Sequence, residues 1–330
     1  MADTFRALYA EQVEGRPRVA LTTLEDRALP PGEVTLDVAF SSLNYKDGLA
    51  LTGKGKILRK FPLVPGIDVA GTVRASTSPR FKTGDAAFAT GWNMGESLWG
   101  GYTQRTRLPA DILQHLPPGL SLKQAMAVGT AGFTAMLCVQ ALEDAGSLKS
   151  GREVVVTGAA GGVGSVAVSL LAALGQKVVA STGRSELRPW LESLGASAIV
   201  DRAVLAEKGP PLASERWGAG VDSVGGQTLA TVLSQTAAEG AIAACGLASG
   251  PDLPVTVFPF ILRGVKLLGV VSVLVPMDRR ERAWKRLVEL LPREKLEAST
   301  SVVPMSKLLE LAPEILAGKT RGRVVVDVNA

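Results

Sequence analysis

The pattern of apolar residues changes a little more than a third of the way along the chain. Before residue 125, the chain predicts short β-strands separated by glycine and proline. Apolar and polar residues alternate at 34–38, as in a half-buried strand, and 69–73 and 85–89 are further strand-like stretches. After residue 125 the apolar runs become continuous, which indicates a domain of another type.

This later part predicts a parallel sheet with helices on both faces, because continuous apolar strands alternate with helical stretches. A strand at 154–156 precedes a helix at 165–174, and a second strand–helix pair is 177–180 and 186–194. Further strands are expected at 198–200, 221–224, 241–245 and 267–273.

Other helices flank this region. A helix over 125–142 is expected to be interrupted by Gly129 and Gly132. An amphipathic helix over 278–291 is expected to expose a basic side, and a last strand at 324–328 is expected to rejoin the first part of the chain. That basic side consists of Arg279, Arg280, Arg282, Lys285 and Arg286.

Composition narrows the class of protein. The 330 residues are 46% hydrophobic and 20% charged, which is typical of a globular protein long enough for two domains. The net charge of +5 comes without basic runs interleaved with aromatic residues, so no nucleic-acid partner is expected. Two cysteines exclude a disulfide framework and indicate the cytoplasm. Neither a signal peptide nor an apolar run of ~18 residues is evident, so no membrane partner is expected.

A glycine-rich turn follows the strand 154–156 directly. Residues 157–164 read Thr-Gly-Ala-Ala-Gly-Gly-Val-Gly and run into a helix. The last two glycine positions of the Rossmann dinucleotide fingerprint are kept, and alanine stands at the first. Such a turn lets the backbone approach a pyrophosphate at a helix N-terminus, whereas the alternative is a turn without a ligand. The predicted contacts are Gly158, Ala160, Gly161, Gly162 and Val163.

The end of the next strand indicates NADPH. NAD enzymes place an acidic residue about 20 positions beyond the fingerprint, on the ribose hydroxyls. Here the corresponding segment contains Thr182, Gly183 and Arg184, and a guanidinium binds a 2′-phosphate through two parallel hydrogen bonds. Arg202, after the third strand, is a candidate second contact, and a plain surface arginine is the alternative for it.

The whole chain resembles the medium-chain dehydrogenase/reductase superfamily, and within it the zinc-free quinone-oxidoreductase branch and its bacterial acrylyl-CoA reductase subgroup. The segments that carry the resemblance are 41–47, 52–56, 62–71, 129–136, 157–164, 258–263 and 318–323. The resemblance implies an α/β fold with a Rossmann doubly wound parallel sheet domain at 126–274 and a GroES-like β-barrel domain formed by 1–125 and 275–330. It places the active site in the cleft between these domains.

The resemblance also implies a site without metal. Zinc-dependent members carry Cys where Asn44 stands, His where Ile67 stands and usually Cys where Thr130 stands. The only histidine, His115, lies in a loop-like stretch, so no convergent set of zinc ligands is expected.

Reduction of an activated C=C bond is the chemistry expected of such a site. Hydride goes to the β-carbon, charge accumulates on the carbonyl oxygen, and the α-carbon takes a proton. The family pattern places three polar residues at the nicotinamide: Tyr45 as proton donor or stacking partner, Asn44 to orient, and Asp47 to hold Tyr45 or a water. A structural turn with a helix N-cap is the alternative for this trio. By the same resemblance, the cofactor also contacts Tyr45, Thr130, Leu247, Ser272 and Arg323.

A basic loop (Lys54, Lys56, Arg59 and Lys60) favours a substrate rich in phosphate, such as coenzyme A, although a solvated loop is the alternative. The predicted function is NADPH-dependent reduction of a short enoyl thioester, acrylyl-CoA to propanoyl-CoA. The alternatives are an NADPH-dependent quinone oxidoreductase and a non-catalytic NADPH-binding protein with a structural or regulatory role. The apolar stretch 267–273 predicts a homodimer, because an open apolar edge strand invites pairing.

Overall fold

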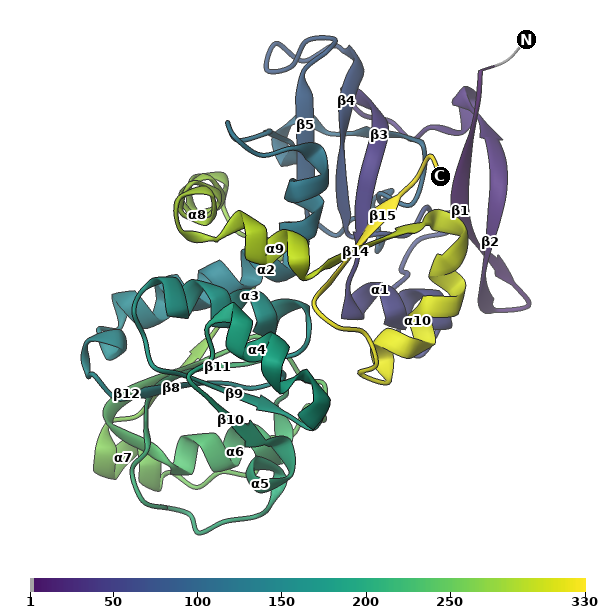
Figure 1. Ribbon diagram of the computed structural model, residues 1–330. Coiled ribbons are helices and arrows are strands. Elements are labelled where there is room, and N and C mark those ends of the chain that lie inside the picture. Colours follow the sequence, from purple (N-terminus) through teal and green to yellow (C-terminus); the bar gives the residue numbers. More distant parts are fainter. Residues whose placement is uncertain (1–2) are drawn as a thin grey trace. The chain divides into compact units, whose positions relative to one another are not determined.

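The computed structural model describes residues 3–330 and divides into two compact units. The first unit contains the chain up to Thr130 together with Val273–Arg279 and Thr300–Ala330. The second contains Ala131–Ser272 and Arg280–Ser299. Figure 1 labels the helices and strands of both units.

The first unit is built on a seven-stranded sheet. Its order is β14-β15-β3-β4-β5-β7, with β6 also pairing with β3, and all neighbours are antiparallel except β14 and β15. A separate antiparallel pair, β1 and β2, completes its strands. The bounds are β1 (Thr4–Val13), β2 (Arg16–Glu25), β3 (Val34–Leu43), β4 (Asp68–Ser76), β5 (Ala86–Thr90), β6 (Arg105–Leu108), β7 (Gln114–His115), β14 (Thr300–Pro304) and β15 (Arg323–Asp327). The helices wholly in this unit are α1 (Tyr45–Thr52) and α10 (Leu308–Leu316), with the one-turn 3-10 helices η1 (Asp26–Ala28), η2 (Ala110–Ile112) and η5 (Met305–Lys307).

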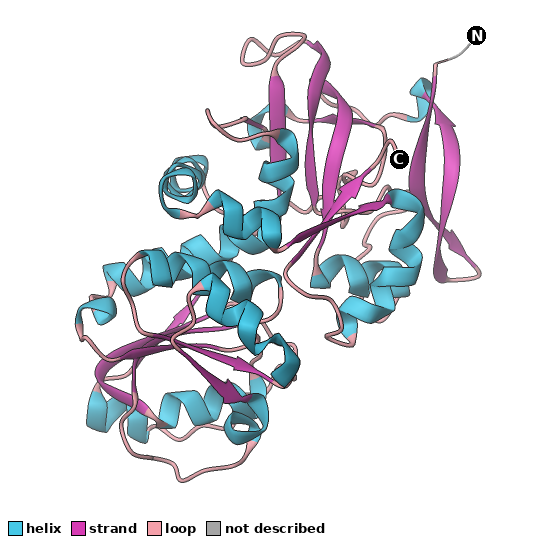
Figure 2. Ribbon diagram, in the orientation of Figure 1, coloured by secondary structure: helices cyan, strands magenta, loops and turns pink. Residues whose placement is uncertain are grey.

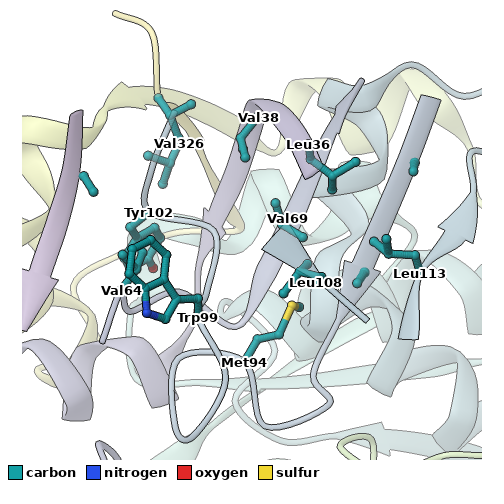
Figure 3. Close-up of a cluster of buried hydrophobic side chains, with 14 of the residues drawn as sticks. Leu36, Val38, Val64, Val69, Met94, Trp99, Tyr102, Leu108, Leu113 and Val326 are labelled. Atoms are coloured by element: carbon teal, nitrogen blue, oxygen red, sulfur yellow. The ribbon is translucent and has the colours of Figure 1, made fainter. Parts of the chain in front are cut away.

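One face of this sheet carries the core of the unit. Leu36 and Val38 of β3, Val69 of β4 and Val326 of β15 are buried members of one hydrophobic cluster (Figure 3). Tyr102 belongs to the same cluster and brings a hydroxyl group into the apolar interior. The cluster fixes the ends of β3, β4 and β15, where the polar residues described below begin.

The second unit contains six parallel strands in the order β10-β9-β8-β11-β12-β13. Numbered along the sheet's own strands this is 3-2-1-4-5-6, the Rossmann order. Helices cover both faces of the sheet, α3 and α4 on one and α5 and α6 on the other (Figures 1 and 2). The strands are β8 (Glu153–Val156), β9 (Val178–Thr182), β10 (Ala198–Asp201), β11 (Trp217–Asp222), β12 (Thr236–Ala244) and β13 (Lys266–Gly269). The helices are α3 (Gly162–Ala173), α4 (Arg188–Leu194), α5 (Arg202–Ala206), α6 (Gly226–Ser234), α7 (Phe258–Arg263) and α9 (Arg293–Ala298), with η3 (Ser147–Lys149) and η4 (Ser185–Leu187).

The predicted doubly wound sheet is confirmed, but some bounds differ from the prediction. The strand expected at 267–273 ends at Gly269, because its partner in the sheet, β12, ends at Ala244 opposite it. The strand expected at 221–224 covers Trp217–Asp222 instead.

Two helices cross the division between the units: α2 (Leu122–Asp144) and α8 (Met277–Leu290). The sequence assigned 275–330 to the first domain as a whole, whereas residues 280–299 group with the second unit. In that unit the ring of Trp284 stacks on Phe133, with centroids 6.3 Å apart. The apolar side of the helix therefore packs in the second unit.

Two of the arginines expected on the exposed basic side of this helix have internal partners. Arg280 is fully buried, with its guanidinium 5.0 Å from the ring centroid of Phe133, and it donates to the carbonyl oxygen of Ser272. Arg286 pairs with the carboxylate of Glu143. The exposed basic face is accordingly smaller than the sequence predicts.

The long helix α2 is interrupted once, at Gly129, whose φ of 51° and ψ of −161° are not helical. The expected second interruption, at Gly132, is absent. Among residues 3–330 this is the helix whose length and composition would allow it to cross a membrane, although the sequence analysis expected no such run. Its most apolar window is 89% buried inside the protein, as in the core helix of a globular protein.

Candidate functional site

In the second unit, the glycine-rich turn leads from β8 into α3. Gly158 has a φ of 59°, and a β-carbon there would lie 2.5 Å from Oγ of Ser223. A β-carbon at Gly164 would lie 2.3 Å from the carbonyl oxygen of Gly158. The packing of the turn against its own surroundings therefore requires both glycines.

Gly161 differs from these two. Its φ is −86°, and a β-carbon there would meet a single atom within 4 Å, the carbonyl oxygen of Gly158 at 3.3 Å. The protein alone thus leaves room at Gly161, beside the half-buried Gly162 and Val163 that open α3. Open space above backbone N–H groups at a helix N-terminus fits the pyrophosphate of a dinucleotide.

A buried acid that the sequence analysis missed fixes the base of this turn. The carboxylate of Asp222, at the end of β11, accepts from Oγ1 of Thr157 at 2.6 Å and from the backbone N–H of Gly225 at 2.8 Å. Burial raises the pKa of Asp222, and these hydrogen bonds act in the opposite direction. The link holds the carboxyl ends of β8 and β11 together.

The residues predicted for the 2′-phosphate gather at the end of β9. The backbone N–H of Arg184 donates to Oγ1 of Thr182 at 3.2 Å, and its Nη2 lies 3.5 Å from the carbonyl oxygen of Ala160 in the glycine-rich turn. Arg202 follows the neighbouring strand β10 and its side chain lies against Gly183. The guanidinium of Arg184 thus lies beside the glycine-rich turn, and the side chain of Arg202 lies against the end of β9.

Two further predicted cofactor contacts follow the strands on the other side of the sheet. Leu247 comes after β12 and is 59% exposed. Its Cα would lie 3.2 Å from a β-carbon at Gly225, so it borders the turn that Asp222 holds. Ser272 comes after β13 and is half-buried. Both therefore lie beyond carboxyl ends of parallel strands, where ligands of such sheets bind.

In the first unit, Asn44 connects β3 to α1. Asp47 Oδ2 accepts from the backbone N–H of Asn44 at 2.9 Å and from its Nδ2 at 3.1 Å, while Oδ1 accepts from the backbone N–H of Ile67 at 3.0 Å. The structural alternative for these residues, a helix-opening turn, is therefore present in the molecule. Tyr45, the first residue of α1, is 39% exposed.

A second missed acid, Asp68, lies at the centre of this region. It is fully buried at the start of β4 and accepts from Oγ of Ser42 at 2.5 Å and Nδ2 of Asn44 at 2.9 Å. It also accepts from the backbone N–H and the hydroxyl of Thr130, at 2.9 and 2.5 Å. The residues that meet here form one buried polar cluster: Ser42, Asn44, Asp47, Asp68, Thr130 and Arg323.

Arg323, at the start of β15, closes this cluster and is 2% exposed. Its Nη1 donates to Oδ1 of Asn44 at 3.3 Å. Its Nε and Nη2 donate to the carbonyl oxygens of Ala127 and Met126 at 2.7 and 3.5 Å, just before the break in α2. All three donating nitrogens are thus directed into the protein.

Burial dominates the electrostatics of the cluster. It raises the pKa of Asp47 to about 7, the charge of Asp68 adds to the rise, and the hydrogen bonds from Asn44 and Ile67 oppose it. Burial also raises the pKa of Tyr102 well above its ordinary value. For Arg323, burial lowers the pKa and the nearby carboxylates oppose that change.

The basic loop is exposed and is connected to α1 through a further residue that the sequence analysis missed. Glu96 is buried, and its carboxylate lies 2.7 Å from Nζ of Lys46 and 3.7 Å from the guanidinium of Arg59. Its carbonyl oxygen also accepts from the backbone N–H of Arg59 at 2.8 Å. Lys46 follows Tyr45, so Glu96 joins the basic loop to the first turn of α1.

Comparison with known proteins identifies the family. Residues 30–118 match the alcohol dehydrogenase GroES-like domain, and residues 162–291 match the domain described as zinc-binding dehydrogenase. The acrylyl-CoA reductase AcuI of Ruegeria pomeroyi is 52% identical over 329 residues, 99% of this chain and 100% of that protein. The chain belongs to the medium-chain dehydrogenase/reductase superfamily. Within it, the putative quinone oxidoreductase YhfP of Bacillus subtilis is 43% identical over 330 residues, 99% of this chain and 100% of that protein.

Solved members of the superfamily share the whole architecture. The crystal structure of YhdH from E. coli K-12 with bound NADPH matches with a TM-score of 0.95 and 50% identity, over 98% of this chain and 100% of that one. The structure of Bacillus subtilis YhfP with NAD bound matches with a TM-score of 0.94 and 42% identity, over 99% of this chain and 100% of that one. The predicted combination of a Rossmann and a GroES-like domain is confirmed.

The matched domain name raises the question of zinc, and the residues at the ligand positions do not fit that metal. Asn44 and Thr130 both donate to Asp68, and Ile67 contributes a backbone N–H beside a buried aliphatic side chain. Within the described part of the chain, no three His, Cys, Asp or Glu side chains gather as metal ligands do.

The predicted site residues therefore form two groups. The cluster residues, Tyr45 and the basic loop lie in the first unit, and the fingerprint, the two arginines, Leu247 and Ser272 lie in the second. Within each unit, contacts between neighbouring elements bring these residues together.

Proposed function

We propose that this protein is an NADPH-dependent reductase of a short enoyl thioester, converting acrylyl-CoA to propanoyl-CoA. The observation that carries the proposal is the 52% identity with AcuI of Ruegeria pomeroyi over the full length of both chains. A second relative, the probable acrylyl-CoA reductase AcuI of E. coli K12, is 50% identical over 98% of this chain.

The choice of NADPH is supported by the end of β9, where Arg184 lies beside the glycine-rich turn and Arg202 lies against Gly183. An arginine pair suits a 2′-phosphate, and an acid at this place would suit a free ribose hydroxyl. The related YhdH structure contains NADPH, whereas that of YhfP contains NAD, so the superfamily branch holds both cofactors.

In the proposed reaction NADPH, when bound, supplies a hydride to the β-carbon of the thioester. The enolate that results must be stabilised, and its α-carbon must take a proton. Tyr45 is the proposed catalytic residue, because its side chain is partly exposed at the start of α1. Asn44 and Asp47 are buried beneath it and hold the turn from which it projects. We assign them positioning roles.

Quinone reduction is the second candidate. YhfP, at 43% identity, carries the name of a putative quinone oxidoreductase, and the same hydride transfer would serve a quinone. The basic loop favours the thioester, because a quinone offers no phosphate for it to bind.

Assembly and location are also proposed. Large apolar side chains remain exposed in and next to α7 and the edge strand β13, namely Val257, Phe258, Ile261, Leu262, Leu267 and Val271. An open edge strand and exposed apolar side chains both favour pairing with a second copy, so we propose a homodimer. Both cysteines are free thiols, which supports the cytoplasm.

The proposed function is tested by following the loss of NADPH absorbance with acrylyl-CoA, with a simple quinone, and with no acceptor. A kcat/KM for acrylyl-CoA above that for the quinone is expected. A quinone preference of an order of magnitude would favour the second candidate. No turnover with either acceptor, despite tight NADPH binding, would favour the non-catalytic alternative.

A further inference from the structure

The break in α2 leaves backbone groups that the helix itself does not satisfy. In a regular helix the N–H of Thr130 would donate to the carbonyl oxygen of Met126. Here that N–H donates to Asp68, and the carbonyl oxygens of Met126 and Ala127 accept from Arg323. A buried carboxylate and a buried guanidinium thus replace the helical partners on the two sides of the break.

Gly129 is what allows both charged groups to reach this point. A β-carbon there would lie 2.7 Å from Nη2 of Arg323, 2.7 Å from Oδ2 of Asp68 and 2.9 Å from Oγ of Ser42. Its φ of 51° also favours glycine. The absence of a side chain at Gly129 therefore lets Asp68 and Arg323 both approach the backbone at the break.

Charge balance requires a cation at this place. Asp47 and Asp68 are both buried, and a buried carboxylate without a compensating charge is strongly destabilising. Arg323 interacts electrostatically with both carboxylates. It supplies the guanidinium of the buried polar cluster. Its N–H groups donate to the amide oxygen of Asn44 and to carbonyl oxygens at the break in α2.

Arg323 also fixes the orientation of Asn44. The amide oxygen accepts from Nη1 of Arg323, so the amide nitrogen faces Asp68 and Asp47, to which it donates at 2.9 and 3.1 Å. Asn44 directly precedes α1. Through this one amide, the guanidinium is connected to the turn that presents Tyr45.

We propose that Arg323 is the internal cation of this zinc-free site and a positioning residue for the first turn of α1. In this chain the side chains at two of the zinc-ligand positions, Asn44 and Thr130, both donate hydrogen bonds to Asp68. The positive charge that compensates the buried carboxylates comes from Arg323, where zinc-dependent relatives would have a metal ion. The catalytic part of this inference rests on the proposed reductase function, and the part concerning stability does not.

The test compares Arg323→Lys and Arg323→Met with a matched control. Arg80, in the same unit, also donates to two carbonyl oxygens, those of Ala110 at 2.9 Å and Leu113 at 3.4 Å. Arg80→Met therefore removes a guanidinium from carbonyl partners without touching the buried polar cluster. For every variant, the thermal midpoint, kcat, KM and the Kd for NADPH are measured.

Arg323→Met is expected to lower kcat at least tenfold, with KM and the Kd for NADPH within about twofold of wild type, and Arg323→Lys should recover part of kcat. Arg80→Met should lower the thermal midpoint without this loss. Arg323→Met/Asp68→Asn should be more stable than Arg323→Met, because the uncompensated carboxylate is removed. That comparison of midpoints holds even if the wild type does not reduce acrylyl-CoA, which would refute the proposed function alone.

Two results would overturn the inference. A weakened NADPH affinity with unchanged kcat would mean that Arg323 acts as a direct cofactor contact, the role implied by the family resemblance. A double variant no more stable than Arg323→Met would show that charge compensation is not its role. If Arg323→Met does not fold, the same criteria apply to Arg323→Lys against Arg323→Lys/Asp68→Asn.

Discussion

The side chain of Arg202 lies directly against Gly183: a β-carbon at Gly183 would stand 2.4 Å from its Nε and 2.8 Å from its Cδ. Any larger residue at Gly183 would displace the guanidinium. The next residue, Arg184, reaches toward the glycine-rich turn at Ala160. The chain thus makes room for one arginine beside the other at the place where the proposed 2′-phosphate would bind.

This arrangement predicts that Arg184 determines cofactor choice. Arg184→Ala should weaken NADPH binding by roughly 10- to 150-fold, since losing one charged hydrogen-bond partner costs ~1.5–3 kcal/mol. NADH binding should remain almost unchanged. Fluorescence titration of both cofactors measures this, with Arg188→Ala, an exposed arginine of α4, as the control. Equal affinity of the wild type for NADPH and NADH would contradict the prediction.

The buried carboxyl of Asp47 predicts a pH dependence of stability. Its pKa is about 7 in the folded chain and ~3.9 in an unfolded one, so between these values the folded state binds a proton that the unfolded state releases. The contribution of this group therefore favours folding most at low pH. It declines as pH rises toward 7, with a slope of at most about 1.4 kcal/mol per pH unit.

Replacing Asp47 by Asn should remove this slope. Denaturant unfolding at pH 5 and pH 8 is the measurement, and the destabilisation of Asp47→Asn relative to wild type should be smaller at pH 8. Asp278→Asn, an exposed carboxylate at the start of α8, is the control and should keep the wild-type dependence. A destabilisation of Asp47→Asn that is equal at both pH values would refute the prediction.

The proposed homodimer predicts that a charge placed among the exposed apolar side chains of α7 lowers the molecular mass measured in solution. Ile261 is 68% exposed on α7, and Ile261→Glu should convert a dimer to a monomer in light scattering at micromolar concentration. Val204→Glu, at a residue 54% exposed on α5, should leave the mass unchanged. A monomeric wild type would remove the basis for this prediction.

The residues at the zinc-ligand positions predict activity without metal. The side chains of Asn44 and Thr130 donate hydrogen bonds to Asp68, so removal of divalent metal should not disturb the buried polar cluster. The enzyme is expected to keep its full rate after prolonged exposure to a strong chelator. Elemental analysis provides the independent measurement, and stoichiometric zinc whose removal abolishes activity would refute the prediction.

The sequence identified the features that are local. The glycine-rich turn, the strand before it and the helix after it are contiguous, so their spacing is visible without a structure. The end of β9 follows the glycine-rich turn at a nearly constant spacing along the chain, so the residues there could also be identified from the sequence. The overextended strand at 267–273 shows the limit of this approach, because its end is set by the length of a neighbouring strand, β12.

The contacts within the buried polar cluster were inaccessible for the opposite reason, although the family resemblance named several of its members. Arg323 and Asn44 are 279 residues apart, and nothing near either residue indicates the other. Gly129 and Gly132 look equivalent in the sequence, yet only Gly129 faces Asp68 and Arg323, and only there is the helix broken. An aspartate inside an apolar run, as at Asp68, is the local signal that could have pointed to a buried site.

The last prediction concerns the substrate. If the basic loop binds the phosphates of coenzyme A, its replacement by alanines should raise KM for acrylyl-CoA and flatten the dependence of KM on salt. The loop variant should reduce a small uncharged quinone almost as well as wild type does, whereas Tyr45→Phe should lower turnover with both acceptors.

The matched control for the loop variant removes four exposed charges elsewhere, at Arg279, Arg282, Lys285 and Arg293. Because remote binding energy helps to position a reacting group, a thioester lacking the nucleotide should lose kcat as well as affinity. Should acrylyl-CoA prove indifferent to the loop, the loop is a solvated surface and quinone reduction becomes the better account.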